Sequence, residues 1–345
     1  MKVFKESFKI EPEVVEQLKA IEVEPEIVEE IRKELLKDLK NYFNMPEDKI
    51  VNVNNLYESR AEIVNNYIDS LVTLWDIVEF AVVSFNNSKL GNRIAVFNVA
   101  GYFNCHGLIN GWCSCTKTCY AGRLEFRQFK KTIRNTIFFL YCKYSIKAEI
   151  YSLFEIGIKR ATNKGLLEVN TVLYEVQAIR FNEAGEIRDL IDLSLLNRVV
   201  RVFREELGRA IKAYTYTTNP AINTFSSSAI VINKSLGFNL KALDTEVNNI
   251  KNCRKYNINE PEEIRKVSNS FTVIIKEPEE IKDIYNKYHA YKSISLCSGS
   301  CRTCRKCSKY NNVVVFLLHG NKSKEQLQQE IGKAASILNE IKGSD

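Results

Sequence analysis

Apolar residues in the first ninety positions recur at spacings typical of α-helices. In residues 58–85 they return every three or four positions. Glu-Pro-Glu occurs at 11–13 and again at 24–26, each time before an amphipathic run. Proline suits the first turn of a helix, and the glutamates that follow favour its N-terminal dipole. We therefore expect residues 1–90 to form a helical extension that packs against the main domain.

From Arg93 onward, β-rich apolar runs alternate with helical segments. The runs lie at 94–100, 171–181, 211–217, 229–233, 271–276 and 312–319, and the helical segments at 125–160, 192–206 and 278–287. This alternation favours a mainly parallel sheet with crossover helices. We expect an α/β domain over residues 91–345, either a partial (β/α)6-type barrel or an open sheet. Six strands fit a partial barrel better than a full eight-stranded one.

Polar groups follow several of these strands, and sites in parallel α/β proteins form at the carboxyl ends of strands. In chain order these groups are the first cysteine group, then Asn182, Glu183 and Glu186, then Thr217, Thr218 and Asn219, then Asn233 and Lys234, and finally His319. The order predicts that polar groups from separate parts of the chain meet on one face.

Composition fits a packed globular protein, with 45% hydrophobic and 10% aromatic residues. Lys and Arg number 49 against 42 Asp and Glu, so the net charge is +7. That charge permits contact with nucleic acid without requiring it. The N-terminus has no signal-peptide core, and the most apolar stretch, 71–85, is interrupted by Asp76 and Glu79. We expect no membrane span and a cytoplasmic location.

Ten cysteines lie mostly in two groups, with Cys142 and Cys253 apart from both. Secreted disulfide frameworks belong to small domains that lack a core, which does not describe this chain. In a reducing compartment, thiols grouped at two- and three-residue gaps are typical metal ligands. The two isolated cysteines are expected not to be ligands, since such a cysteine commonly behaves as a small apolar residue.

The first group lies in the segment FNCHGLINGWCSCTKTCYAGRLEF. Its thiols are Cys105, Cys113, Cys115 and Cys119, and His106 is also available. Thiolates suit iron–sulfur clusters, zinc or copper(I). Four ligands would close the coordination sphere, whereas three cysteines on a four-iron cluster would leave one iron open for a substrate or cofactor. At this point, a closed metal site that only stabilises the loop is about as well supported as a site with an open iron. Trp112 and Tyr120 are expected to shield the metal from water.

The second group, CSGSCRTCRKC, is the most specific signal in the chain. It carries Cys297, Cys301, Cys304 and Cys307. The spacing is closer to ferredoxin-like runs than to paired zinc knuckles, which favours iron–sulfur slightly over zinc. The interleaved Arg302, Arg305 and Lys306 are expected to offset the thiolate charge, with phosphate contact as the alternative. We expect this quartet to fold the C-terminal segment by binding metal.

Two further segments carry side chains suited to a ligand. FNEAGE at 181–186 follows a strand, and its carboxylates suit an amino group or a ribose. An ordinary polar turn is the commoner interpretation of such a segment. In 213–220, Tyr214 and Tyr216 fall on one face of a strand, where packing is the commoner role.

In order along the chain, these motifs resemble the phage gene product 88 family, whose members look like distant relatives of radical S-adenosylmethionine (SAM) enzymes. The resemblance covers roughly residues 93–320. Its elements are C-x3-C-Y-A at 115–121, AIRFNEAGE at 178–186, AYTYT at 213–217, and CSGSCRTC-x2-C at 297–307 before a strand that ends in His319.

The resemblance implies a four-iron cluster (4Fe-4S) held by three cysteines, with SAM on the open iron, a reductant as partner, and a viral or mobile-element origin. It implies that Asn182, Glu183, Glu186 and Tyr216 bind the cofactor, with Glu183 or Glu186 on the SAM amino group. The terminal quartet would hold a second iron–sulfur cluster or zinc. The spacing here is C-x-C-x3-C, where the wider family has C-x3-C-x2-C. The alternative function is a non-catalytic zinc- or cluster-stapled protein that binds nucleic acid.

Overall fold

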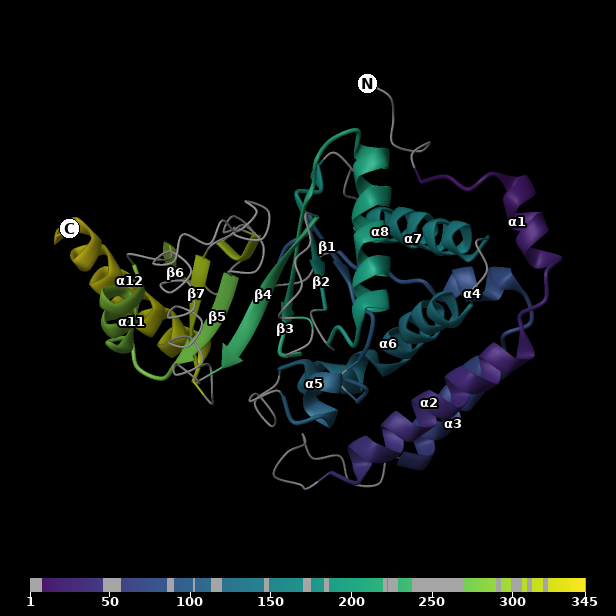
Figure 1. Cartoon of the computed structure of the whole chain (residues 1–345), viewed down its shortest axis with the longest axis horizontal. Coiled ribbons are helices and arrows are strands. Elements are labelled where there is room, and N and C mark those ends of the chain that lie inside the picture. Colours follow the sequence, from purple (N-terminus) through teal and green to yellow (C-terminus); the bar gives the residue numbers. More distant parts are fainter. Residues whose placement is uncertain are drawn as a thin grey trace, which may run out of the picture. The chain divides into compact units, whose positions relative to one another are not determined.

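The computed structural model of the chain forms two compact units, Met1–Ala213 and Tyr214–Asp345 (Figure 1). The described residues are 8–45, 57–85, 90–101, 103–112, 120–145, 149–169, 175–182, 186–219, 222, 229–237, 270–289, 293–298, 306–308, 312–318 and 322–344.

Four helices open the first unit: α1 (Pro12–Lys19), α2 (Pro25–Phe43), α3 (Tyr57–Asp69) and α4 (Leu74–Phe80). Both predicted proline starts are confirmed, because α1 and α2 each begin at the proline of a Glu-Pro-Glu triplet. The single helical stretch expected over 58–85 is wrong. Thr73 begins a new helix there, since Asp76 Oδ2 accepts hydrogen bonds from the Thr73 backbone N–H at 2.7 Å and from its hydroxyl at 3.0 Å.

The long helix expected over 125–160 is also two helices, α6 (Tyr120–Tyr144) and α7 (Glu149–Glu168). They pack closely, and the rings of Phe138 and Phe154 stack with centroids 5.5 Å apart. The short α5 (His106–Ile109) precedes them, and α8 (Leu190–Leu207) follows. The N-terminal helices lie against α6 and α7 (Figure 1). Helix α4 packs on both of them, and α2 packs on α6.

Seven strands form one open, all-parallel sheet in the order β1-β2-β3-β4-β5-β7-β6. They are β1 (Ile94–Phe97), β2 (Ala178–Phe181), β3 (Lys212–Thr217), β4 (Ile230–Gly237), β5 (Ser270–Ile275), β6 (Ser293–Leu296) and β7 (Asn312–Leu317). The predicted α/β fold with N-terminal helices is confirmed, in its open-sheet form. The expected strand number was one too low, because β6 was missed.

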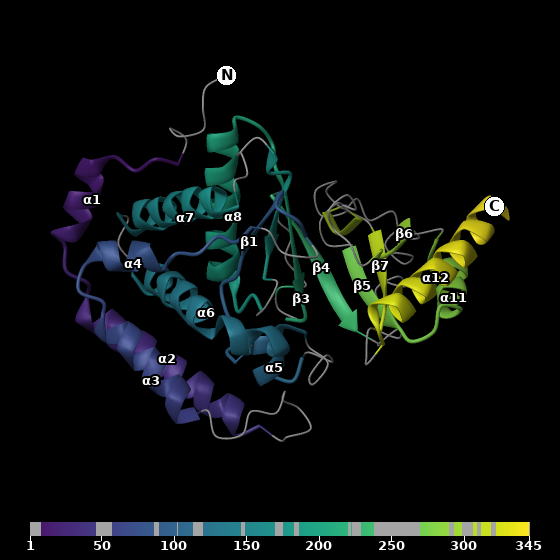
Figure 2. The same ribbon diagram turned by 180° about the vertical axis from the view of Figure 1, so that it is seen from behind.

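The second unit has its own apolar core. Helices α11 (Glu280–Tyr288) and α12 (Lys324–Ser344) pack together and against β6 and β7 (Figure 2). Buried side chains of β5 and β7 fill the space beneath them, Phe271 and Val313 among them. The sequence did not single out α12. Its Lys342 Nζ donates a hydrogen bond to the Ile294 carbonyl at 3.2 Å, which ties the helix to β6.

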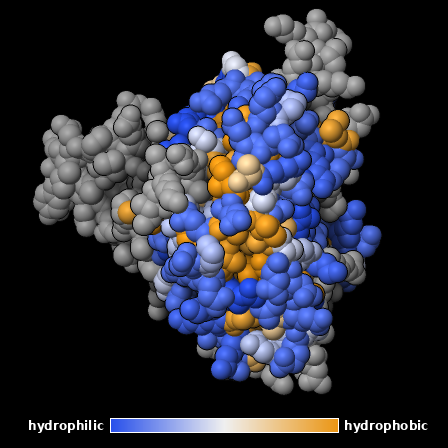
Figure 3. Space-filling model, turned by 90° about the vertical axis from the view of Figure 1, so that its right-hand side faces the viewer, coloured by the Kyte–Doolittle hydropathy of each residue, from blue (hydrophilic) through white to orange (hydrophobic). Residues whose placement is uncertain are grey.

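Apolar residues form a strip among hydrophilic ones on the face that carries the N-terminal helices (Figure 3). Two exposed apolar side chains of this part of the chain are Ile21 and Val72. Backbone hydrogen bonds bring their segments together, from Val23 N to Val72 O and from Leu74 N to Ile21 O.

Within the described residues, none of the helices is long and apolar enough to cross a membrane.

Candidate functional site

The carboxyl ends of β1 and β2 are joined by Asn182. Phe97 and Phe181 are in register, so both strands end at the same edge. Asn182 follows β2 with φ of 50°, a left-handed conformation that asparagine tolerates better than most residues. Its backbone N–H donates to the Phe97 carbonyl at 3.0 Å, and its Oδ1 accepts from the Val99 N–H at 3.0 Å. The first residue after β2 therefore fixes the loop that leaves β1.

That loop runs directly to the first cysteine group. Asn104 is fully buried, and its Oδ1 accepts a hydrogen bond from the Gly101 N–H at 2.6 Å. Cys105 follows, half-buried and reduced, at the start of α5. Asn182 and Asn104 thus both bind the loop that leaves β1, and Cys105 follows Asn104 directly. The meeting of the cysteine group and the FNEAGE turn at one site stays a prediction.

His106 lies in an environment that keeps its imidazole neutral. Burial lowers its pKa to about 4, and the positive charge of Arg188 acts in the same direction. A neutral imidazole has a lone pair that accepts a hydrogen bond or binds a metal ion.

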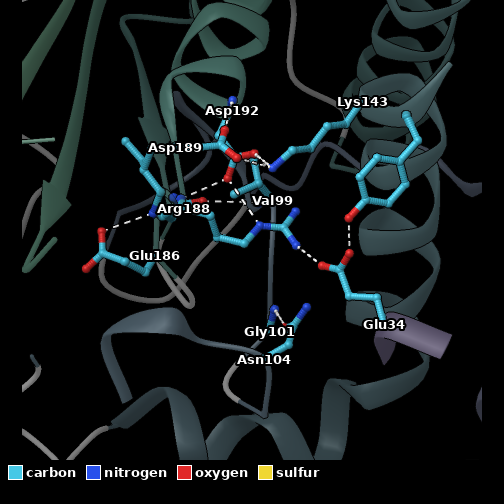
Figure 4. A network of polar contacts seen from close by, with 12 residues as sticks. Glu34, Val99, Gly101, Asn104, Lys143, Glu186, Arg188, Asp189 and Asp192 are labelled. Atoms are coloured by element: carbon cyan, nitrogen blue, oxygen red, sulfur yellow. Dashed lines mark hydrogen bonds and ion pairs between the residues drawn. The ribbon is translucent and has the colours of Figure 1, made fainter. Parts of the chain in front are cut away.

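A network of charged side chains lies beside this edge (Figure 4). Arg188, almost fully buried, contacts Glu34 Oε1 through Nη1 at 2.6 Å and Asp192 Oδ2 through Nε at 3.2 Å. Lys143 Nζ contacts Asp189 Oδ2 at 2.6 Å and Asp192 Oδ1 at 2.8 Å. The network therefore ties Arg188 and the start of α8 to α2 and α6.

Local sequence explains the aspartates of this network. Asp189 is the N-cap of α8, and its Oδ1 accepts from the Asp192 N–H at 3.0 Å. Burial acts to raise the pKa of Asp189, but the hydrogen bond from Lys143 and that from the Asp192 N–H outweigh it and lower the pKa. Glu34 differs, because burial raises its pKa despite the nearby Arg188. The Tyr144 hydroxyl also donates to Glu34.

Glu186 is the predicted cofactor-binding carboxylate that the structure describes. It is buried, and its Oε1 accepts from the Ile187 N–H at 3.0 Å (Figure 4). Glu183, Cys113, Cys115 and Cys119 lie outside the described residues. Searched over the described part of the chain, no group of three or more His, Cys, Asp or Glu side chains has metal-binding geometry. The predicted first metal site therefore stays a prediction.

The second cysteine group occupies the connection between β6 and β7. Cys297 and Cys307 are both buried, and Cys297 N donates to the Val315 carbonyl at 2.8 Å. Lys306 Nζ donates to the Leu296 carbonyl at 3.0 Å, which joins the residue before Cys307 to the residue before Cys297. The segment is thus closed at its base. Cys301 and Cys304 lie outside the described residues, as do Arg302 and Arg305.

Buried asparagines hold the end of this closed segment. Lys306–Ser308 forms a single 3-10 turn, η4. Asn233 Nδ2 donates to the carbonyls of Cys307 and Thr215, each at 3.0 Å, and Asn312 Nδ2 donates to the Lys306 carbonyl at 3.0 Å. These bonds fix the Cys307 backbone beside β4 and β7.

Tyr216 belongs to the second unit, where its ring makes edge contacts with Tyr214 and Phe316. Its predicted part in cofactor binding stays a prediction. Cys142 is fully enclosed in α6, and burial raises the pKa of its thiol, which fits the apolar role expected for it. Cys253 lies outside the described residues.

Comparisons with protein-family models, with curated proteins and with solved structures find no match to this chain. Function must therefore be argued from the site itself.

Sequence reasoning missed most of the polar network. The residues that it did not single out are Glu34, Asn104, Lys143, Arg188, Asp189 and Asp192. Of these, Asn104, Arg188 and Asp192 are buried. One signal was available, because Asp189 followed three residues later by Asp192 marks a helix start. The partners of these aspartates come from α2 and α6, at sequence distances that no local pattern reveals.

Proposed function

We propose that this chain is an iron–sulfur enzyme that binds SAM at the carboxyl ends of β1 and β2. The supporting observation is the pair of hydrogen bonds from Asn182 to the exit of β1. Through them, the turn expected to hold the cofactor is attached to the loop that carries the first cysteines. The end of β2 and the exit of β1 therefore share one edge of a parallel sheet, where α/β proteins place their ligands, and this supports a site built from the segments that follow the two strands.

The residues present suit a cluster and its ligand. Cys105 is a reduced, half-buried thiol, and three further cysteines follow within residues 113–119. Soft thiolates are the ligands that iron–sulfur clusters require. When bound, a four-iron cluster with an open iron supplies the electron that cleaves SAM. Cys115 and Cys119, with Cys105 or Cys113 as the third, are the proposed ligands.

The protein's own residues hold the ligand in position. Arg188 and Lys143, paired with Asp192, fix the segment that follows Glu186, so that the carboxylate of Glu186 or Glu183 meets the SAM amino group. A buried network whose charges are mutually paired is rigid, because breaking one pair strands a charge in an apolar region. The site is therefore pre-organised before the cofactor binds.

The terminal quartet is proposed to bind a second iron–sulfur cluster or zinc. Two of its thiols are buried at the ends of a segment that the Lys306–Leu296 hydrogen bond closes. Closure at the base brings the two ends of the segment together, which suits a single metal centre. Because Lys306 Nζ is already bonded within the protein, its contribution here is structural.

Anaerobic reconstitution tests the proposal. The protein should take up iron and sulfide and, once reduced and given SAM, release methionine and 5′-deoxyadenosine. Cys119→Ala should abolish this cleavage. Cys142→Ala is the matched control, since that thiol is buried in α6 and should leave iron content and cleavage unchanged. Glu183→Ala should weaken SAM binding with iron content intact.

Other outcomes would contradict the proposal. A colourless protein that contains zinc alone and neither binds nor cleaves SAM would support the stapled nucleic-acid-binding protein instead. Such a protein should bind nucleic acid with an affinity that falls steeply as salt is raised.

A further inference from the structure

Two buried asparagines beside the proposed site each use only half of their side-chain amide. Asn104 and Asn182 accept hydrogen bonds through Oδ1 from the N–H groups of Gly101 and Val99. Their Nδ2 atoms are buried, and neither has a hydrogen-bond partner among the described residues. Asn104 is 0% exposed and Asn182 is 4% exposed. A buried donor without a partner destabilises the fold, so these two donors call for an explanation.

The orientation of both amides is fixed by their backbone partners. A backbone N–H is a donor, so the atom that meets it must be the side-chain oxygen. Rotating either amide by half a turn would place two donors against each other. The groups left over are therefore N–H donors in both residues.

Both donors are anchored to the same short stretch of chain. Val99 and Gly101 are two residues apart in the loop that leaves β1, so their Cα atoms are about 7 Å apart at most. Asn104 comes from the far end of this loop, and Asn182 from the end of β2. The loop that leaves β1 and the end of β2 thus contribute one donor group each, and both are held by the backbone of residues 99–101.

We infer that the amides of Asn104 and Asn182 bind the carboxylate of an amino-acid-bearing cofactor at this site. The inference rests on the proposed function, which supplies SAM as that cofactor. A carboxylate only accepts hydrogen bonds and has two oxygens, which matches two donor groups and no acceptor. It is also the only anionic group of SAM, so these donors distinguish the amino-acid end of the cofactor from its adenosine end.

Neutral donors suit this place because the nearby cations are already engaged. Arg188 is paired with Glu34 and Asp192, and Lys143 with Asp189 and Asp192. Hydrogen bonds to a charged acceptor are stronger than those between neutral groups, so two amides give useful affinity without a further buried charge.

The test compares SAM with decarboxylated SAM, which lacks only the carboxylate. Binding is measured by calorimetry on the anaerobically reconstituted protein. The unaltered chain should bind SAM at least about tenfold more tightly than the decarboxylated form. Asn104→Asp and Asn182→Asp keep an oxygen for the backbone N–H but replace the donor with an acceptor. Each should weaken SAM binding by about tenfold or more and leave the decarboxylated form bound as before.

Asn135→Asp is the matched control. Asn135 is buried nearby, but both ends of its amide are engaged within the protein, with the Val82 N–H and the Asn98 carbonyl. Its substitution should leave the ratio of the two affinities unchanged, and thermal unfolding of every variant checks the fold.

Two results overturn the inference in distinguishable ways. Equal affinity for both ligands, unchanged in the Asn104 and Asn182 variants, would leave the proposed function standing and assign the two donors to buried water. Absence of binding by either ligand to the reconstituted unaltered chain would remove the proposed function, and this inference with it.

Discussion

Asp38 is a residue whose ionisation is strongly altered by its surroundings. It lies on α2, buried, and its Oδ2 has no hydrogen-bond partner among the described residues. Burial raises its pKa to about 7, and Glu34 one turn earlier adds to the effect, while Arg188 and Lys37 oppose it. The folded chain therefore holds a proton at mildly acidic pH that the unfolded chain releases.

This gives a first prediction, on the pH dependence of stability. Because the folded pKa is above the unfolded value of about 4, the stability that Asp38 contributes is lost as pH rises from about 4 to about 7. Asp38→Asn removes the buried charge. The gain in unfolding free energy from this change should be about 2–3 kcal/mol larger at pH 8 than at pH 5. Urea unfolding of both proteins at the two pH values measures it, and an equal gain at both would contradict it.

At the scale of helices, α6 and α7 pack so closely that one glycine has no room for a side chain. A Cβ on Gly157 would overlap the ring of Phe138 and lie 3.3 Å from the Cβ of Ala81. Both neighbours are buried, and Phe138 is held by its stack with Phe154. The α6–α7 contact thus depends on this glycine.

The second prediction compares two glycine-to-alanine changes. Gly157→Ala should destabilise the protein by about 1–3 kcal/mol, because the packed helices must move apart. Gly332→Ala, in α12, is the control, since nothing lies within 4 Å of the added Cβ. It should stabilise by about 0.5–1 kcal/mol through the better helix propensity of alanine. Denaturant unfolding followed by circular dichroism compares the two variants. An unchanged free energy of unfolding in Gly157→Ala would contradict the prediction, because it would mean that α6 and α7 can move apart at no cost.

Strands with strong apolar runs were predictable, and elements defined by their neighbours were not. β5 and β7 are rich in valine, isoleucine and phenylalanine, a composition that predicts a buried strand. β6 has the sequence SISL and carries two serines, so only its pairing with β7 identifies it as a strand. Helix α6 ends at Tyr144, although residues 145–148 contain no proline or glycine that would break a helix.

For the candidate site too, local motifs were predictable from the sequence and long-range contacts were not. The FNEAGE segment pointed to the end of β2, where Asn182 binds the exit of β1. Cysteine spacing pointed to the segment that follows β1, in which Cys105 precedes α5. The pairing of Arg188 with Glu34 spans 154 positions, and that of Asn182 with Val99 spans 83. Such contacts depend on the finished tertiary structure, so periodicity and motif spacing carry no information about them.

At the scale of the whole molecule, the two compact units have separate cores, and only the second contains the terminal quartet. If the quartet binds a structural metal as proposed, loss of that metal should act unevenly over the chain. Local stability differs between parts of a protein, and hydrogen exchange reports it segment by segment.

The third prediction follows. Stripping the quartet of metal, by chelation or by the double change Cys301→Ser and Cys304→Ser, should speed amide exchange in β6, η4 and β7, because they flank the cysteines directly. Exchange in α6 and α7 should stay as it was. Hydrogen–deuterium exchange followed by mass spectrometry measures both. The quartet is excluded as a structural metal site if metal content falls and β6 keeps its protection.

The strand order at the end of the sheet also bears on how the chain is made. β7 lies between β5 and β6, although β6 is earlier in the sequence. During translation, β6 therefore leaves the ribosome first and the four cysteines of the quartet follow. Only then does β7 emerge, the strand with which β6 pairs. During synthesis the cysteines are accessible before the sheet edge is complete. If the quartet binds metal as proposed, the metal can reach its thiols before the strand that completes this part of the sheet has emerged.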